Sequence, residues 1–160
     1  MGNVGLTAAL SEIEQSSKPH FNQVVLAAPD IDTKVFKEEI ASKIVAKARH
    51  TTLYTSKNDL ALIASRYFNQ RNRVGDSGPD VTIIDGIDTI DATAVDSSLL
   101  GHTYYGSNVT VLDDLSLLLQ NQPIESRHYL KAMDRGPRPY WAFEPVRLSR
   151  SPVLQSGLNR

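Results

Sequence analysis

The sequence predicts an α/β fold in which about three parallel strands are flanked by helices. Residues 24–28 form a short, continuously apolar run, which is typical of a strand buried on both faces of a parallel sheet. Stretches with helical spacing of apolar residues lie on both sides of this run. The alternation of helix and strand continues along the chain, and right-handed crossovers between such units make the sheet parallel.

Spacing and chain-breaking residues predict each element in turn. Residues 3–15 have the spacing of an amphipathic helix, and a polar stretch ending in Pro19 interrupts it. A strand follows at residues 21–28, and Asp32 or Thr33 can cap the helix after it. The remaining expected elements are a strand at 51–54, a helix at 59–68, a loop at 69–79, a strand at 81–84, an irregular acidic stretch at 85–100 and a helix at 108–119.

The composition of the chain changes near residue 121. Residues 1–121 carry the alternation of helices and strands and form one domain in this prediction. Residues 122–160 contain the breaker Gly136-Pro137-Arg138-Pro139 and a tail rich in Ser, Arg and Pro. We expect this part to be an irregular, partly mobile C-terminal extension, with a short helix at 125–133 and an aromatic cluster at 140–143 that covers an edge of the core.

Charge and composition exclude several classes of protein. The net charge is −1 over 160 residues, so no nucleic-acid partner is expected. The absence of cysteine excludes disulfides, thiolate metal sites and cysteine nucleophiles. No apolar run approaches the roughly 18 residues of a membrane span, and no signal peptide is visible. We expect a soluble protein without a cofactor, cytoplasmic by default.

Two ionisable side chains follow expected strands. Asp59 comes after the second strand, and His102 lies between Gly101 and Gly106, ahead of the last helix. Ligand chemistry collects at the carboxyl ends of parallel strands, and an imidazole exchanges protons near neutral pH. The pair therefore suits acid–base catalysis. Asp59 also has the position of a helix N-cap, and the two roles can coexist. Considered alone, His102 is predicted to be a surface loop residue rather than a catalytic one.

Other candidates have weaker support. Asp91 or Asp96 is the alternative acid, since either lies close to His102 in sequence. The acidic stretch does not have calcium-loop spacing, so no metal site is expected. The other histidines lack a partner pattern, and the available serines lie in no Gly-flanked turn between strand and helix; these residues are His20, His50, His128, Ser56, Ser97 and Ser98.

Three stretches carry a specific combination of motifs: residues 25–32, residues 53–62, and residues 90–92 leading to 101–105. In this order they resemble a bacterial alpha/beta-hydrolase family of uncharacterised function, whose members are described as esterase/lipase-like. The resemblance covers roughly residues 1 to 120. In that family the nucleophile elbow reads His-Ser-Met-Gly-Asn, a form of G-x-S-x-G, and this chain opens Met1-Gly2-Asn3.

The resemblance implies a role for each matching residue. The triad order is serine, acid, histidine, so Asp59 corresponds to the acid and His102 to the base. Met1 would carry the oxyanion-hole N–H, and Gly2 is the remnant of the elbow. The serine would precede Met1. The resemblance thus implies a partial alpha/beta-hydrolase fold: the C-terminal portion of a serine hydrolase acting on small-molecule esters, truncated before residue 1 and inactive alone.

A second class of function also fits the sequence. A partial sheet exposes its edge strand at residues 23–28, and unpaired strand edges pair readily with other chains. The chain would then be a non-catalytic interaction or dimerisation module. Its partner would be a second copy or a complementing N-terminal half.

Overall fold

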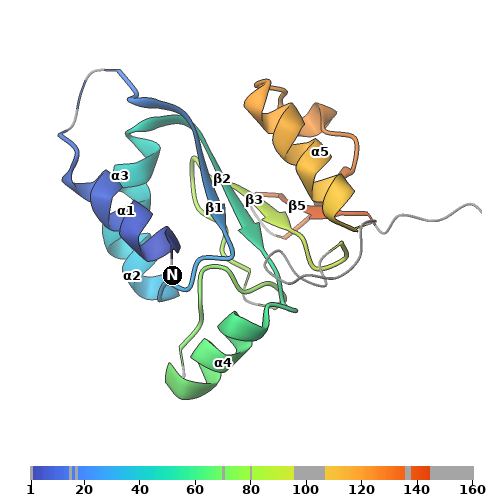
Figure 1. Cartoon of the computed structure of the whole chain (residues 1–160), viewed down its shortest axis with the longest axis horizontal. Helices are drawn as coiled ribbons and strands as arrows, with labels where there is room; N and C mark the ends of the chain where they lie inside the picture. The colour runs from blue at the N-terminus through green and yellow to red at the C-terminus, as the bar shows by residue number, and fades with distance from the viewer. Residues whose placement is uncertain are drawn as a thin grey trace, which may run out of the picture.

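The computed structural model describes residues 2–14, 16, 18–69, 71–79, 81–95, 107–135 and 138–144. A five-stranded sheet with the order β1-β2-β3-β5-β4 lies at its centre (Figure 1). The four parallel strands are β1 (Phe21–Ala27), β2 (Ala48–Thr55), β3 (Asp88–Asp91) and β5 (Tyr140–Phe143). Strand β4 (Leu130–Met133) runs antiparallel to β5 and forms one edge of the sheet.

Helices cover both faces of this sheet. One face is covered by α1 (Gly2–Glu12) and by a continuous helical segment made of α2 (Thr33–Val35), the π-helical η1 (Phe36–Ile40) and α3 (Ala41–Val45). The other face is covered by α5 (Ser107–Leu119). Helix α4 (Leu60–Asn69) follows β2, and the short 3-10 helix η2 (Ile124–Ser126) precedes β4 (Figure 1).

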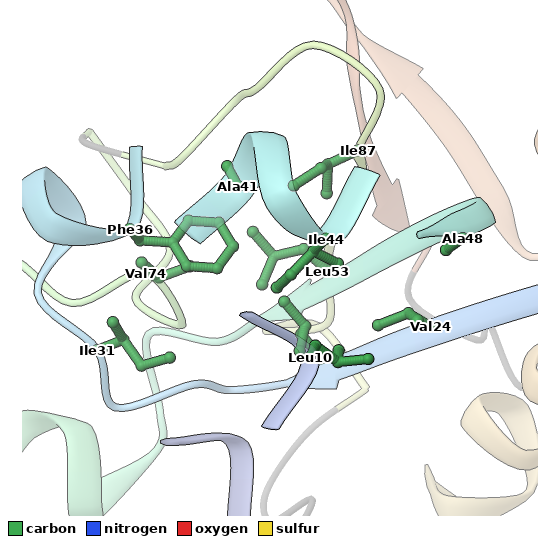
Figure 2. Packing of buried hydrophobic residues seen from close by; sticks show 11 residues of the cluster. Leu10, Val24, Ile31, Phe36, Ala41, Ile44, Ala48, Leu53, Val74 and Ile87 are labelled. Atoms are coloured by element: carbon green, nitrogen blue, oxygen red, sulfur yellow. The ribbon is translucent and has the colours of Figure 1, made fainter. Parts of the chain in front are cut away.

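Each face has its own hydrophobic core, and β2 contributes to both. Residues 51–56 are all buried, with Leu53 in one cluster and Tyr54 in the other, because successive side chains of a strand point to opposite faces. Figure 2 shows Phe36 and Ile44 gathered with Leu53 on the first face. The second cluster consists of Tyr54, Ile90, Ala92, Val95, Val111, Ile124 and Phe143.

Most of the predicted elements are confirmed within a few residues. They are the helix at 3–15, the strands at 21–28 and 51–54, and the helices at 59–68 and 108–119. Asp32 caps the second helical segment, its carboxylate accepting from the backbone N–H groups of Lys34 and Val35 at 2.9 and 3.1 Å. The prediction that residues 24–28 are buried on both faces is wrong, since Ala27 is exposed at the sheet edge.

The predicted strand at residues 81–84 is also wrong. The chain turns at Gly86, whose φ is 79°, and Ile84 and Ile87 form an isolated bridge across this turn. Strand β3 comes after the turn, inside the stretch that was expected to be irregular. The preceding residues pack beside the sheet, where the Thr82 carbonyl accepts from the Thr89 hydroxyl at 2.8 Å.

The region after residue 121 is more regular than expected. Its described part contains η2, β4 and β5, so the sheet has five strands rather than about three. The predicted helix at 125–133 is wrong, because the chain enters β4 at Leu130. The aromatic cluster forms β5 and pairs with β3, Ile90 opposite Trp141. The division of the chain at residue 121 stays a prediction.

Candidate active site

Asp59 lies just beyond the carboxyl end of β2 and begins α4. Its Oδ1 accepts from the backbone N–H of Leu62 at 3.1 Å, and its carbonyl accepts from the N–H of Ile63 at 3.0 Å. The side chain is half-buried. These contacts are those of a helix N-cap, the structural role that its position suggested. The cap uses Oδ1 and holds the carboxylate at a defined place on this edge of the sheet.

The first turn of α1 lies at the same edge. The side-chain amide of Asn3 donates to the carbonyl of Ala27 at 2.7 Å, and Ala27 pairs with Tyr54 near the end of β2. Figure 1 shows the start of α1 and α4 toward the same end of the sheet. Gly2 is exposed, and a Cβ added there would meet nothing within 4 Å. Met1, the predicted oxyanion donor, lies outside the described residues.

His102 also lies outside the described residues, but both flanks of its segment, 96–106, can be placed. Before the segment, Thr93 is bonded to the loop that leads to Asp59. Its hydroxyl accepts from the Lys57 N–H at 3.1 Å, and its carbonyl accepts from the Asn58 side-chain amide at 3.3 Å. The chain therefore enters residues 96–106 from beside the acid loop.

After the segment, α5 runs antiparallel to the strands. Beyond its C-terminal end, the Asn121 side chain accepts from the amide groups of Asn22 and Gln23 in the first half of β1, at 2.6 and 3.2 Å. In its middle, Asp114 accepts from the Tyr54 hydroxyl near the carboxyl end of β2 at 2.5 Å. The start of α5 is therefore at the carboxyl edge of the sheet, the same edge at which β3 ends before Thr93.

A buried polar cluster fixes α5 to β2. The Arg127 guanidinium donates from Nε to Asp114 Oδ1 at 2.8 Å and from Nη2 to Asp114 Oδ2 at 2.6 Å. The same Nη2 lies 3.3 Å from the Tyr54 hydroxyl oxygen. Tyr54 and Asp114 are each 1% exposed and Arg127 is 3% exposed. Burial and the adjacent Asp114 carboxylate raise the pKa of the Tyr54 phenol, which therefore stays a hydrogen-bond donor.

Two loops are in tight contact at this carboxyl edge of the sheet. Ala28, directly after β1, has a φ of 42°, in the left-handed region that non-glycine residues rarely occupy. A Cβ at Gly75 would lie 2.4 Å from the carbonyl carbon of Ala28, so the approach requires glycine. The Gly75 carbonyl accepts from the N–H of buried Ser56 at 2.8 Å. This contact ties residue 56 to the end of β1.

With this geometry in place, comparison with known proteins gives one finding. A family model described as "Alpha/beta hydrolase of unknown function (DUF900)" matches residues 1–121. The chain belongs to this alpha/beta-hydrolase family. The matched range includes Asp59 and His102 and ends before η2, β4 and β5. Comparisons with curated proteins and with solved structures give no match.

In this hydrolase-family chain the acidic residues of the predicted loop lie in different places. Asp88 begins β3, at the opposite end of the sheet from Asp59, and burial raises the pKa of its carboxyl group. Asp85 pairs with Arg138 at 2.9 Å. Asp91 ends β3 at the carboxyl edge, and its Oδ1 accepts from the Thr93 N–H at 2.9 Å, so it stays the alternative acid. Asp96 lies outside the described residues.

The described residues show neither a metal cluster nor a membrane span. Within the described ranges, no three or more His, Asp or Glu side chains gather as metal ligands would. No helix in the part of the chain that the structure describes has the length and apolarity needed to cross a bilayer. His20, His50 and His128 are exposed.

The residues that hold these elements together are not among the candidates that the sequence predicts. Asp114 gives a detectable signal, because it stands on the buried stripe of α5 between Val111 and Leu118. A charged residue on such a stripe is rarely buried without a partner. Its partner Arg127 lies 13 residues later, directly after η2, and has no local signature. Thr93 has none either.

Proposed function

We propose that this chain carries the acid and the histidine of the catalytic triad of a serine hydrolase that cleaves acyl esters, in the manner of esterases and lipases. His102 takes the proton of the serine hydroxyl as it attacks the acyl carbonyl, and returns it to the leaving alcohol. Asp59 holds the imidazole in the correct tautomer and stabilises the imidazolium. No serine of residues 1–160 is assigned as the nucleophile.

One observation carries this proposal. In a chain of this family, Asp59, the first turn of α1 and both flanks of the segment that bears His102 are all at the carboxyl edge of the sheet. Catalytic groups of open α/β sheets gather at that edge. The N-cap role of Asp59 supports the proposal as well, because the bond from the Leu62 N–H to Oδ1 fixes the carboxylate at a strand end.

The topology also favours a place for the serine. Strand β1 is an edge strand, and α1 covers the same face as the crossover from β1 to β2. A parallel strand added beside β1 and joined to α1 would make a crossover of the same hand, which is the permitted one. Its turn into α1 would lie at the edge that holds Asp59, as a nucleophile elbow requires. Met1 would then donate its backbone N–H to the oxyanion, next to Gly2.

Complementation tests the proposal. The chain is co-expressed with an N-terminal segment that ends in Gly-His-Ser, and p-nitrophenyl ester turnover is measured. We expect turnover by the complex and none by the chain alone. His102→Ala should lower kcat about 10⁶-fold, and Asp59→Asn about 10⁴-fold, as in comparable triad enzymes.

Asp88→Asn serves as the matched control, since Asp88 lies at the opposite end of the sheet. It should leave turnover unchanged. Full activity of the Asp59→Asn complex would contradict the assignment of Asp59 as the acid and would favour Asp91 in that role. Turnover by the unaccompanied chain that disappears in His102→Ala would contradict the assignment of the serine.

The alternative function, a non-catalytic interaction module, is favoured by the character of β1. Residues 21–27 contain no charged residue and no proline, the features that usually protect an edge. The Phe21 N–H donates to the Lys47 carbonyl at 3.0 Å, so the N–H of the next residue, Asn22, points away from β2. An added strand or a second copy could pair there.

Sedimentation equilibrium over a range of concentrations tests this second function. Asn22→Pro removes one outward N–H and should shift a self-associating chain toward the monomer. Asn22→Ala is the control, because it removes the same side-chain bond to Asn121 and keeps the N–H. A monomeric parent chain at all concentrations would exclude self-association through β1.

A further inference from the structure

A small cavity lies beneath the C-terminal end of α5, at the amino-terminal ends of β2 and β3. Its volume is about 110 Å³, and two ionisable side chains that the proposed ester chemistry does not use, Asp88 and Arg127, line it. Leu118, Pro123 and Ile124 supply apolar walls. An engineered cavity of about 150 Å³ accommodates benzene, so this one has room for a smaller molecule of about four or five heavy atoms.

Arg127 has hydrogen-bond donors that its partners leave unused. The residue is 3% exposed, and its Nε and Nη2 donate to the Asp114 carboxylate. Its third nitrogen, Nη1, makes no hydrogen bond to any residue that the structure describes. Because Arg127 lines the cavity, the N–H groups of Nη1 are available to a molecule inside it. A carboxylate is the acceptor whose geometry fits a guanidinium group best.

Asp88 supplies the second polar group of the cavity. Within the described part of the chain, its carboxyl group forms no hydrogen bond and no ion pair, not even with Arg127. Burial raises the pKa of this carboxyl group, the charges of Arg127 and His50 lower it, and the charge of Glu125 raises it further. Burial is the largest of these effects, so Asp88 takes up a proton more readily than an exposed aspartate does. A protonated carboxyl group donates a hydrogen bond.

We propose that this cavity binds a short-chain monocarboxylate such as acetate or propionate. The ligand carboxylate accepts from Nη1 of Arg127 and from Asp88, which takes up one proton when the ligand binds. The total charge of the buried cluster then stays the same, because the ligand brings one negative charge and Asp88 loses one. The alkyl group lies against Leu118 and Ile124. Asp88 begins β3 at the opposite end of the sheet from Asp59, so this site is separate from the proposed ester-hydrolysing edge.

Titration of the intact chain with sodium acetate tests the proposal. Binding is followed by ¹H–¹⁵N NMR at pH 5.5 and constant ionic strength. We expect saturable shifts of the Arg127 Nε–H resonance and of the Asp88 and Ile124 amide resonances. Acetamide should bind more weakly because it brings no charge to Arg127, and methylammonium should not bind.

Two results of this titration would contradict the proposal. Acetate that causes no saturable shift would overturn it, since that result is expected of a cavity that holds only water. Acetamide that binds as tightly as acetate would overturn the choice of a carboxylate as the ligand.

The pH dependence of binding identifies the proton donor. Proton uptake by Asp88 makes the affinity for acetate fall about tenfold for each unit of pH above the pKa of this carboxyl group. Asp88→Asn keeps a hydrogen-bond donor that does not titrate, so its affinity for acetate should be the same at pH 5.5 and pH 7.5. An unchanged pH dependence in Asp88→Asn would overturn the role of Asp88.

His50→Gln is the matched control, because His50 also lines the cavity and an imidazole titrates in this range of pH. This variant should keep the fall in affinity between pH 5.5 and pH 7.5. Loss of the fall in His50→Gln would show that the imidazolium, rather than Asp88, controls binding, and would likewise overturn the role of Asp88.

Arg127→Lys tests the contact with Nη1. It keeps the positive charge and removes the guanidinium group, so a folded variant should bind acetate about 10- to 100-fold more weakly. An unchanged affinity would overturn the proposed contact. Asp88→Asn keeps the pair between Asp114 and Arg127, so that variant and the ligand series carry the test if Arg127→Lys does not fold.

Discussion

The two faces of the sheet are stabilised in different ways. On the face under α1, α2, η1 and α3, apolar side chains such as Phe36, Ile44 and Leu53 pack together. On the face under α5, an ion pair and a tyrosine hydroxyl lie inside the apolar cluster. Apolar packing tolerates small shifts, whereas a bidentate ion pair has one good geometry. The comparison indicates that the first face mainly supplies stability and that the second mainly fixes position.

The largest effect is expected for Arg127→Met. This change leaves the Asp114 carboxylate buried without its guanidinium partner and should cost about 3–5 kcal/mol of unfolding free energy in urea titrations. The triple variant Tyr54→Phe/Asp114→Leu/Arg127→Met should recover the stability of the parent, because it removes both charges and the buried hydroxyl that donates to Asp114. A triple variant as unstable as Arg127→Met would show that the polar cluster itself stabilises the α5 face, and the comparison would fail.

Lys47→Met tests a buried cation on the apolar face. Lys47 is 4% exposed, and its ammonium donates to the carbonyl of Leu10 at 2.5 Å, near the end of α1. Its removal should cost about 1–3 kcal/mol, because the charged hydrogen bond is lost. Urea titration measures the loss. Lys47→Arg keeps the charge, and a loss equal to that of Lys47→Met would show that shape rather than charge matters there.

Ile44→Val should have a smaller effect on the same face. Ile44 is fully buried, and removing one methylene typically costs about 0.5–1.5 kcal/mol. The loss should appear as a lower urea midpoint with an unchanged m-value. A loss of unfolding free energy near that of Arg127→Met would mean that the core under α1, α2, η1 and α3 tolerates small changes of shape no better than the core under α5.

Asp88→Asn should have the smallest effect and should depend on pH. Asp88 lines a cavity of about 110 Å³ beneath α5, together with Leu118 and Arg127. Burial raises the pKa of its carboxyl group, so the folded state favours the protonated form. Its ionisation therefore lowers stability as pH rises above the unfolded value of 3.8, and the penalty is complete above the folded pKa.

Thermal unfolding of the parent and of Asp88→Asn at two pH values measures this penalty. The variant should melt at a higher temperature than the parent at pH 7 and at the same temperature at pH 3. An equal difference at both pH values would show that the effect comes from packing and not from charge.

The sequence predicts the helices better than the strands. Helical periodicity and the Asp32 cap are local signals, and both are confirmed. The third strand is different, because β-branched apolar residues precede the turn at Gly86 and Thr89-Ile90 follow it. Which side of the turn enters the sheet depends on pairing with β2 and β5, and no local pattern carries that information.

The candidate site also has one part that local sequence signals predict and another that they do not. The position of Asp59 after a strand and before a helix is visible in the sequence, and its cap is confirmed. Its partnership with His102 stays a prediction, since residue 102 lies outside the described residues. The bonds that hold both flanks of that segment join residues 36 and 60 positions apart, such as Lys57 with Thr93 and Tyr54 with Asp114, and pairings of this kind arise only from the folded chain.

The two edge strands of the sheet, β1 and β4, differ in length and in charge. Strand β4 is four residues long and carries Lys131, which pairs with Glu144 at 3.8 Å, whereas β1 is seven residues long and uncharged. If two copies joined through β1, the edge strands left outside would be short and charged, and these would disfavour further joining. Such an assembly would close by symmetry at a pair and would not propagate into a fibre.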